Sequence, residues 1–104
     1  MTLDGKQYVG WQLDGIGFDH QLFTVYLARH WIGAAEAANL AALRSQARII
    51  FFWREDLVLS KASHGATLSE ISENGEGRSV KYTFKFSDDS KIEVTAGAVT
   101  ELVL

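Results

Sequence analysis

The stretch IIFFW, residues 49–53, decides the fold, because it places five apolar residues in a row between two arginines. A strand that shows one face to water alternates apolar with polar residues, whereas this run is apolar on both faces. It is too short for a buried helix, and β-branched and aromatic residues favour strands. We therefore predict a strand that is covered on both faces, with residues 49, 51 and 53 on one face and residues 50 and 52 on the other.

Length and composition indicate one soluble globular domain over residues 1–104, with one hydrophobic core. The net charge of −3 argues against a general nucleic-acid-binding protein, whose binding surface should be basic. The chain has no cysteine, which excludes disulfides, thiolate zinc sites and thiol nucleophiles. The sequence contains no recognisable signal peptide and no apolar segment near the ~20 residues that span a bilayer. We therefore expect a cytoplasmic protein that does not enter a membrane.

The clearest helix prediction covers residues 34–46, which are rich in Ala and Leu and contain no glycine or β-branched residue. Strands are predicted around 6–14, 49–53, 57–59, 67–73, 80–86, 92–95 and 99–104, with turns at 14–17 and 55–56. The expected fold class is α+β, a mainly antiparallel sheet of five to seven strands packed against one main helix, about 34–46. Such a helix would cover one face of residues 49–53 and leave the other face to a second subunit or a ligand.

The segment 21–29 is ambiguous. Its residues favour a strand, but Asp19 fits a helix N-cap with Phe18 and Phe23 as a hydrophobic staple. We predict a strand and keep a helix within 19–31 as the alternative.

Alternation of apolar and polar residues over 80–86 predicts a half-buried antiparallel strand, followed by a turn at 88–90 and a second alternating strand. An odd-length turn keeps the apolar residues of both strands on one face. We expect it to place Phe86 opposite Ile92 and Phe84 opposite Val94.

No metal site and no cofactor are predicted. His20 and His30 would lie about 33 Å apart along a strand, too far to share a metal. His64 precedes Gly65 in a loop, where polar groups often act, so it is the one polar candidate site residue. A surface histidine in a turn is the favoured interpretation of His64.

Aromatic residues make up 12% of the chain, and three of them are tryptophans. Trp and Tyr combine a large apolar area with one hydrogen-bond donor, which suits protein interfaces and small-molecule pockets. The candidate ligand- or partner-binding residues are Trp53, Trp31, Trp11, Tyr26 and Phe51. We expect the face that carries Trp53 to meet a partner or a ligand.

The leading functional hypothesis is a self-associating binding protein, a dimer or larger homo-oligomer, for a small apolar or aromatic ligand or a protein partner. A second hypothesis is an immunity-like or antitoxin-like inhibitor, because a small acidic protein suits electrostatic steering to a basic target. A third is a small enzyme that uses His64 or His20 with a carboxylate. No motif in the sequence is specific enough to decide between these classes.

Overall fold

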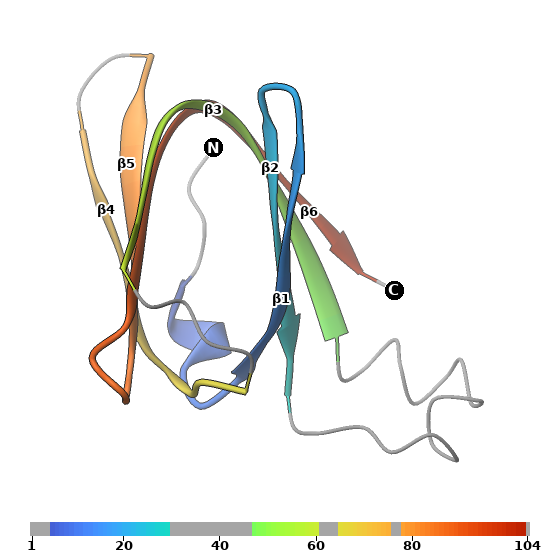
Figure 1. Ribbon diagram of the computed structural model, residues 1–104, viewed down its shortest axis with the longest axis vertical. Coiled ribbons are helices and arrows are strands. Elements are labelled where there is room, and N and C mark those ends of the chain that lie inside the picture. The colour runs from blue at the N-terminus through green and yellow to red at the C-terminus, as the bar shows by residue number, and fades with distance from the viewer. Residues whose placement is uncertain (1–4, 30–46, 61–64, 76–77, 104) are drawn as a thin grey trace.

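The computed structural model describes residues 5–29, 47–60, 65–75 and 78–103, and most of these lie in one antiparallel sheet (Figure 1). The sheet has six strands in the order β1-β2-β3-β6-β5-β4. A 3-10 helix precedes them. The elements are η1 (Gly5–Tyr8), β1 (Gln12–Asp19), β2 (Leu22–Ala28), β3 (Ala47–Ser60), β4 (Leu68–Asn74), β5 (Val80–Phe86) and β6 (Lys91–Val103).

The predicted α+β class is wrong, because the described residues form an all-β fold in which η1 is the one helical element. The predicted helix over 34–46 lies outside the described residues. The antiparallel sheet itself is confirmed, and its six strands fall within the predicted five to seven. The predicted strand over 49–53 is confirmed as part of β3, which is much longer than expected.

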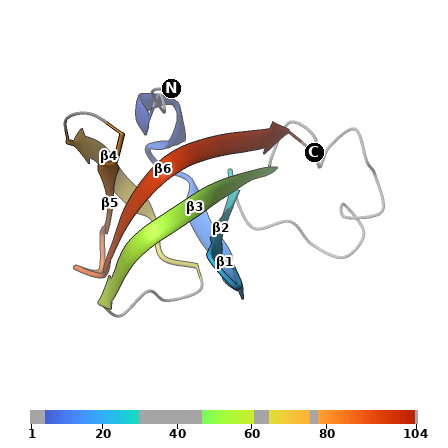
Figure 2. The same ribbon diagram turned by 90° about the horizontal axis from the view of Figure 1, so that it is seen from above.

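Two long strands explain how the inner face of residues 49–53 is covered without a helix. β3 and β6 run side by side and bend together, so that the two halves of the sheet face each other (Figures 1 and 2). At the bend the register shifts between Trp53 and Asp56, where the partner residues jump from Ala98 to Ala96. Bulges of this kind bend a strand and increase its twist. The turn predicted at 55–56 is therefore wrong, since the acidic pair lies in the bend of one continuous strand.

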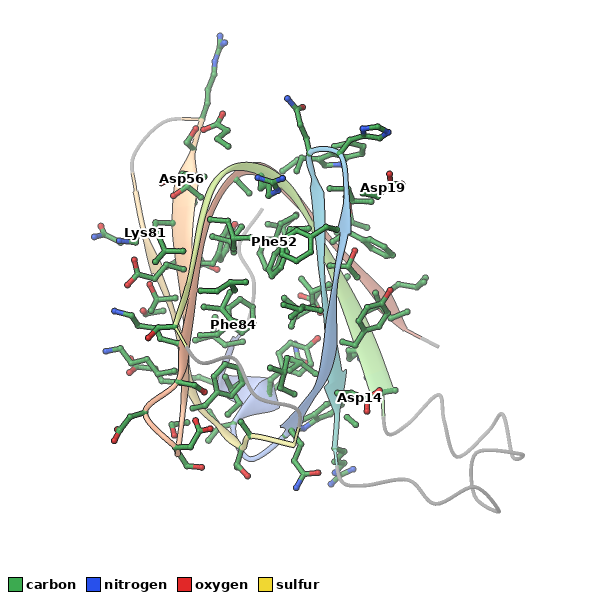
Figure 3. All side chains as sticks on the ribbon, in the orientation of Figure 1. Asp14, Asp19, Phe52, Asp56, Lys81 and Phe84 are labelled. Carbon is green, nitrogen blue, oxygen red and sulfur yellow. The ribbon has the colours of Figure 1, made fainter. Side chains whose placement is uncertain are left out.

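The core fills the space between the two halves of the sheet. Phe52 is fully buried, and its ring lies 5.3 Å from the Tyr82 ring and 5.8 Å from the Phe84 ring in the opposite half. Phe52 and Phe84 point into this space, whereas Lys81 points outward (Figure 3). Buried aliphatic residues from β1, β2 and β6 complete the core, among them Leu13, Val25, Leu27, Ile92, Val94 and Val99. The second half of the same sheet thus supplies the cover that the sequence assigned to a helix.

The N-terminal part of the chain differs from the prediction. Residues 5–8 form η1 and not a strand, and β1 runs through the predicted turn at 14–17. A single bridge between Gln12 and Thr67 brings the start of β1 to the start of β4, so the two edges of the sheet meet at one end. The strand predicted over 21–29 is confirmed as β2.

The hairpin of β5 and β6 has the predicted odd-length turn but a different register. Phe84 lies opposite Ile92 and Lys85 lies opposite Lys91, two positions away from the expected pairing. Asp89 adopts a φ of 67°, which lets a tight turn close after Phe86. The shift of two residues keeps every side chain on its expected face. The strands predicted at 92–95 and 99–104 are one strand, β6.

Candidate interaction surface

The outer face of the half-sheet formed by β1, β2, β3 and β6 carries a group of large apolar side chains. Residues that are paired across antiparallel strands lie on the same face, and the pairs here are Tyr26 with Ile49, Ile49 with Leu102, and Trp53 with Ala98. We call Tyr26, Ile49, Phe51, Trp53 and Leu102 the outer apolar face. The alternation predicted for residues 49–53 is confirmed, because Ile50 and Phe52 are fully buried on the inner face.

Three of these side chains are exposed to solvent to an unusual degree. Trp53 is 55% exposed, Leu102 45% and Tyr26 37%. Single exposed apolar residues are ordinary, but several on one rigid sheet face mark an interaction surface. The described residues thus include an exposed aromatic and aliphatic surface around Trp53.

Two glycines of β1 determine how Tyr26 lies. A Cβ atom at Gly17 would be 3.5 Å from Cε2 and 3.6 Å from Oη of Tyr26, and one at Gly15 would be 3.8 Å from Cδ2. The Tyr26 ring therefore lies flat along β1, with no side chain beneath it. This flat ring continues the apolar surface from β3 toward the edge of the sheet.

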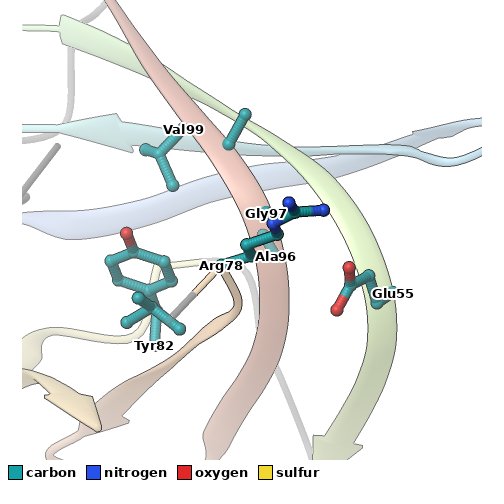
Figure 4. A pocket seen from close by; sticks show the side chains of 8 residues that line it. Glu55, Arg78, Tyr82, Ala96, Gly97 and Val99 are labelled. Atoms are coloured by element: carbon teal, nitrogen blue, oxygen red, sulfur yellow. The ribbon is translucent and has the colours of Figure 1, made fainter. Parts of the chain in front are cut away.

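Two open hollows adjoin this surface at the bend. One, of about 620 Å³, is lined by Glu55, Arg78, Val80, Tyr82, Ala96, Gly97, Ala98 and Val99. It lies where β5 separates from β6, and the small residues of β6 form its floor (Figure 4). The other, of about 500 Å³, includes Trp53, Gln21 and Arg54 with the same stretch of β6. The backbone of β6 at 97–98 is therefore accessible beside Trp53.

The predicted site residues are distributed as follows. Trp53, Phe51 and Tyr26 lie together on the outer apolar face. Trp11 lies apart from them, packed against the core. Trp31 and His64 are outside the described residues. Sequence reasoning did not single out Leu102 as a site residue, although the apolar end of the predicted last strand was a signal that it needed cover.

A polar cluster inside the fold involves Trp11. The buried Tyr8 hydroxyl donates a hydrogen bond to the Glu101 carboxylate, and burial followed by this carboxylate raises the pKa of Tyr8 well above its usual range. The Arg48 guanidinium lies 5.5 Å from the Trp11 ring centroid, and the Trp11 ring meets the Tyr8 ring edge-on at 5.2 Å. The hydrogen bond between Tyr8 and Glu101 links η1 to β6, so the cluster has a structural role.

His20 occupies the tip of the hairpin between β1 and β2, where its side chain is 96% exposed and lies 3.7 Å from Asp19. Its φ of 54° is a turn conformation. Among the described residues, no three His, Asp or Glu side chains gather in a way that would hold a metal ion. The described part of the chain also contains no helix long and apolar enough to cross a membrane.

Comparisons with protein-family models, with curated proteins and with solved structures find no match to this chain. The class that the fold and the surface define is therefore an all-β domain with an exposed aromatic face, and the function has to be argued from that face.

Proposed function

We propose that this chain is a self-associating protein, and that a second copy covers the outer apolar face in the assembly. The observation that carries the proposal is the exposure of Trp53, at 55%, on the same face as Tyr26 and Leu102. Tryptophan and tyrosine are enriched in interfaces and contribute disproportionately to binding. A rigid sheet that presents them pays little conformational entropy on association.

Charge supports a second copy as the occupant. The outer apolar face has no ionisable group other than the Tyr26 hydroxyl. Two carboxylates border it on the outermost strand, Asp14 in the β1 bulge and Asp19 opposite Leu22. Two copies can therefore approach with this face without opposing like charges at its centre. A highly charged partner would find no complementary group there.

The test compares two substitutions on β3. Trp53→Thr removes the most exposed aromatic side chain from the outer apolar face. Val58→Thr is the matched control, since Val58 is on the same strand beyond the bend and is 51% exposed. Sedimentation velocity over 1–100 μM, a range chosen as on the order of typical weak association, should show association for the wild type and Val58→Thr and weaker association for Trp53→Thr. A wild-type chain that stays monomeric throughout would refute the proposal.

A further inference from the structure

We propose that self-association occurs through the edge of β6, residues 98–102, which pairs antiparallel with the same segment of a second copy. This inference rests on the self-association proposed above, and it assigns the contact to the part of the outer apolar face around Trp53 and Leu102. The two half-sheets of four strands, β1, β2, β3 and β6, would then join into one continuous sheet of eight. An edge strand offers a row of backbone donors and acceptors that an added strand satisfies.

The free edge of β6 begins beyond Ala96, the partner of the first residue of β5. β5 pairs with β6 from Lys91 to Ala96, with Val80 opposite Ala96, whereas β3 pairs with β6 as far as Val103. Within the described residues, the side of β6 opposite β3 therefore has no strand partner beyond Ala96. The 620 Å³ hollow opens at this point. The Arg78 carbonyl oxygen and a Glu55 carboxylate oxygen each lie 3.7 Å from where a Cβ atom at Gly97 would be, so the room for an approaching strand begins at Ala98.

The edge also lacks the devices that usually prevent such pairing. Proteins protect edges with lysine, proline or charged side chains. The chain has no proline, and residues 96–103 contain one charged residue, Glu101, whose carboxylate accepts the hydrogen bond from Tyr8 on the inner side. The other edges carry more charge: β1 carries Asp14 and Asp19, β4 carries Glu70 and Glu73, and the free half of β3 carries Asp56.

The register of the pair follows from the pleat, because residues directly opposite each other in an antiparallel pair share a face. A symmetric register centred on Glu101 would oppose two carboxylates, which is unfavourable. One centred on Val99 would place the partner's Leu102 opposite Ala96, a position that Val80 already occupies. The register centred on Thr100 avoids both conflicts, and it places Thr100 opposite the partner's Thr100.

This register also explains the exposure of Trp53. It places the partner's Leu102 opposite Ala98, and Ala98 is the cross-strand neighbour of Trp53. Trp53, Ala98 and the partner's Leu102 then form one row across three adjacent strands. Strands are ~4.8 Å apart, so the indole can lie over the small Ala98 and reach the partner's leucine. Two exposed residues of the outer apolar face, Trp53 and Leu102, are covered together.

A disulfide tests the register directly, because the chain has no cysteine of its own. Opposite Cα atoms in an antiparallel pair are ~4.5–5.5 Å apart, within the range that a disulfide spans. We expect Thr100→Cys to form a covalent dimer under mild oxidation. Lys85→Cys is the matched control, since Lys85 is exposed on β5 but is paired on both sides, with Glu70 and Lys91. It should stay uncross-linked.

Charges introduced at residue 100 provide the second test. Thr100→Lys and Thr100→Glu each place like charges opposite one another at the axis, and each should weaken the dimer by ~5-fold. An equimolar mixture of the two variants should restore association, since the introduced lysine then faces the introduced glutamate. Thr100→Val, which keeps a β-branched strand residue, should associate like the wild type.

The outcomes separate the two proposals. Suppose that the wild type associates and that Trp53→Thr weakens this association. If Thr100→Cys then gives no covalent dimer and the two charged Thr100 variants do not complement each other, edge pairing is refuted and self-association through the outer apolar face stands. If the wild type is monomeric, both proposals fail. Cross-linking at Thr100 together with complementation in the mixture supports pairing at the edge of β6.

Discussion

The two faces of residues 49–53 should differ sharply in their contribution to stability, and adjacent substitutions measure the difference. Phe52 is fully buried and its ring contacts the rings of Phe23, Tyr82 and Phe84. Truncation of such a residue leaves a cavity, so we expect Phe52→Ala to cost ~4 kcal/mol. The total stability of a small domain is ~5–15 kcal/mol, so this loss is a large fraction of it.

Trp53→Thr should cost much less in the isolated chain, because Trp53 is 55% exposed. The buried remainder of a side chain of ~250 Å² corresponds to at most ~3 kcal/mol at 25 cal/mol per Å². This is an upper bound, because the unfolded chain already buries some of that area and threonine restores part of it. We therefore expect a loss of ~1–2 kcal/mol for Trp53→Thr.

Urea unfolding followed by far-UV circular dichroism measures both effects without relying on tryptophan emission. With a slope of ~2 kcal/mol per M, Phe52→Ala should lower the midpoint by ~2 M and Trp53→Thr by less than ~1 M. The measurement is made at low protein concentration and repeated at high concentration, because association adds stability by mass action. Equal losses for the two variants at low concentration would refute the assignment of the two faces.

Three further predictions concern single sites. The pKa of Tyr8 is raised in the folded chain, so the stability that the raised pKa contributes is present below the ordinary pKa of 10.0 and is lost as the pH rises through the folded value. Tyr8→Phe removes the ionisable hydroxyl and its hydrogen bond to Glu101, so the melting temperature of this variant should fall less above pH 10 than that of the wild type. The ammonium groups of Lys81 and Lys91 hold the pKa of Glu93 down to about 2. The contribution of the ionised Glu93 to folding stability should therefore persist below pH 4.5 and vanish as the pH approaches 2. An NMR titration of Glu93 should give this low pKa, and the pKa should rise in 1 M salt because salt screens the two ammonium groups. A Cβ atom at Gly5 would lie 2.6 Å from Cβ of Ile71 on β4, so Gly5→Ala should lower the free energy of unfolding by ~1–3 kcal/mol in the same urea assay. An unchanged urea midpoint would contradict this packing of η1 on β4.

The sequence predicted β4, β5 and two pieces of β3, residues 49–53 and 57–59, because the signals of these segments are local. Runs of β-branched and aromatic residues, or strict alternation, identify a strand without any knowledge of what packs on it. The split of residues 49–53 into a buried pair and an outer set also followed from alternation alone. These predictions needed no tertiary information.

The fold class was missed because bends and turns have similar local composition. The acidic pair at 55–56 reads as a turn, yet β3 continues through it, since β6 bends alongside it at Gly97. Gly15 and Gly17 also read as a turn, but they lie within β1 and accommodate the ring of Tyr26. In both places the deciding contact comes from a strand distant in sequence, which a single sequence does not reveal.

The candidate site was predicted only in part, again because the pairing of strands distant in sequence is not visible in a single sequence. Tyr26 and Trp53 come from different strands, and only the pairing of β2 with β3 places them on one face. Leu102 joins them through β6, whose length depends on the bend. A residue pattern can indicate that a strand has two apolar faces, but the identity of each cover is a property of topology.

The bend therefore links the fold to the proposed function. Because β3 and β6 bend together, the second half of the sheet covers the inner residues Ile50 and Phe52 and has no surface left to cover the outer ones. β5 begins at Val80, opposite Ala96 at this bend, which leaves the β6 edge beyond Ala96 free among the described strands next to Trp53. An uncovered apolar face and an unpaired edge thus lie side by side at the bend. A second copy that pairs with that edge satisfies the backbone of β6 and covers Trp53 in a single contact, and a partner that binds only the face would leave the edge unexplained.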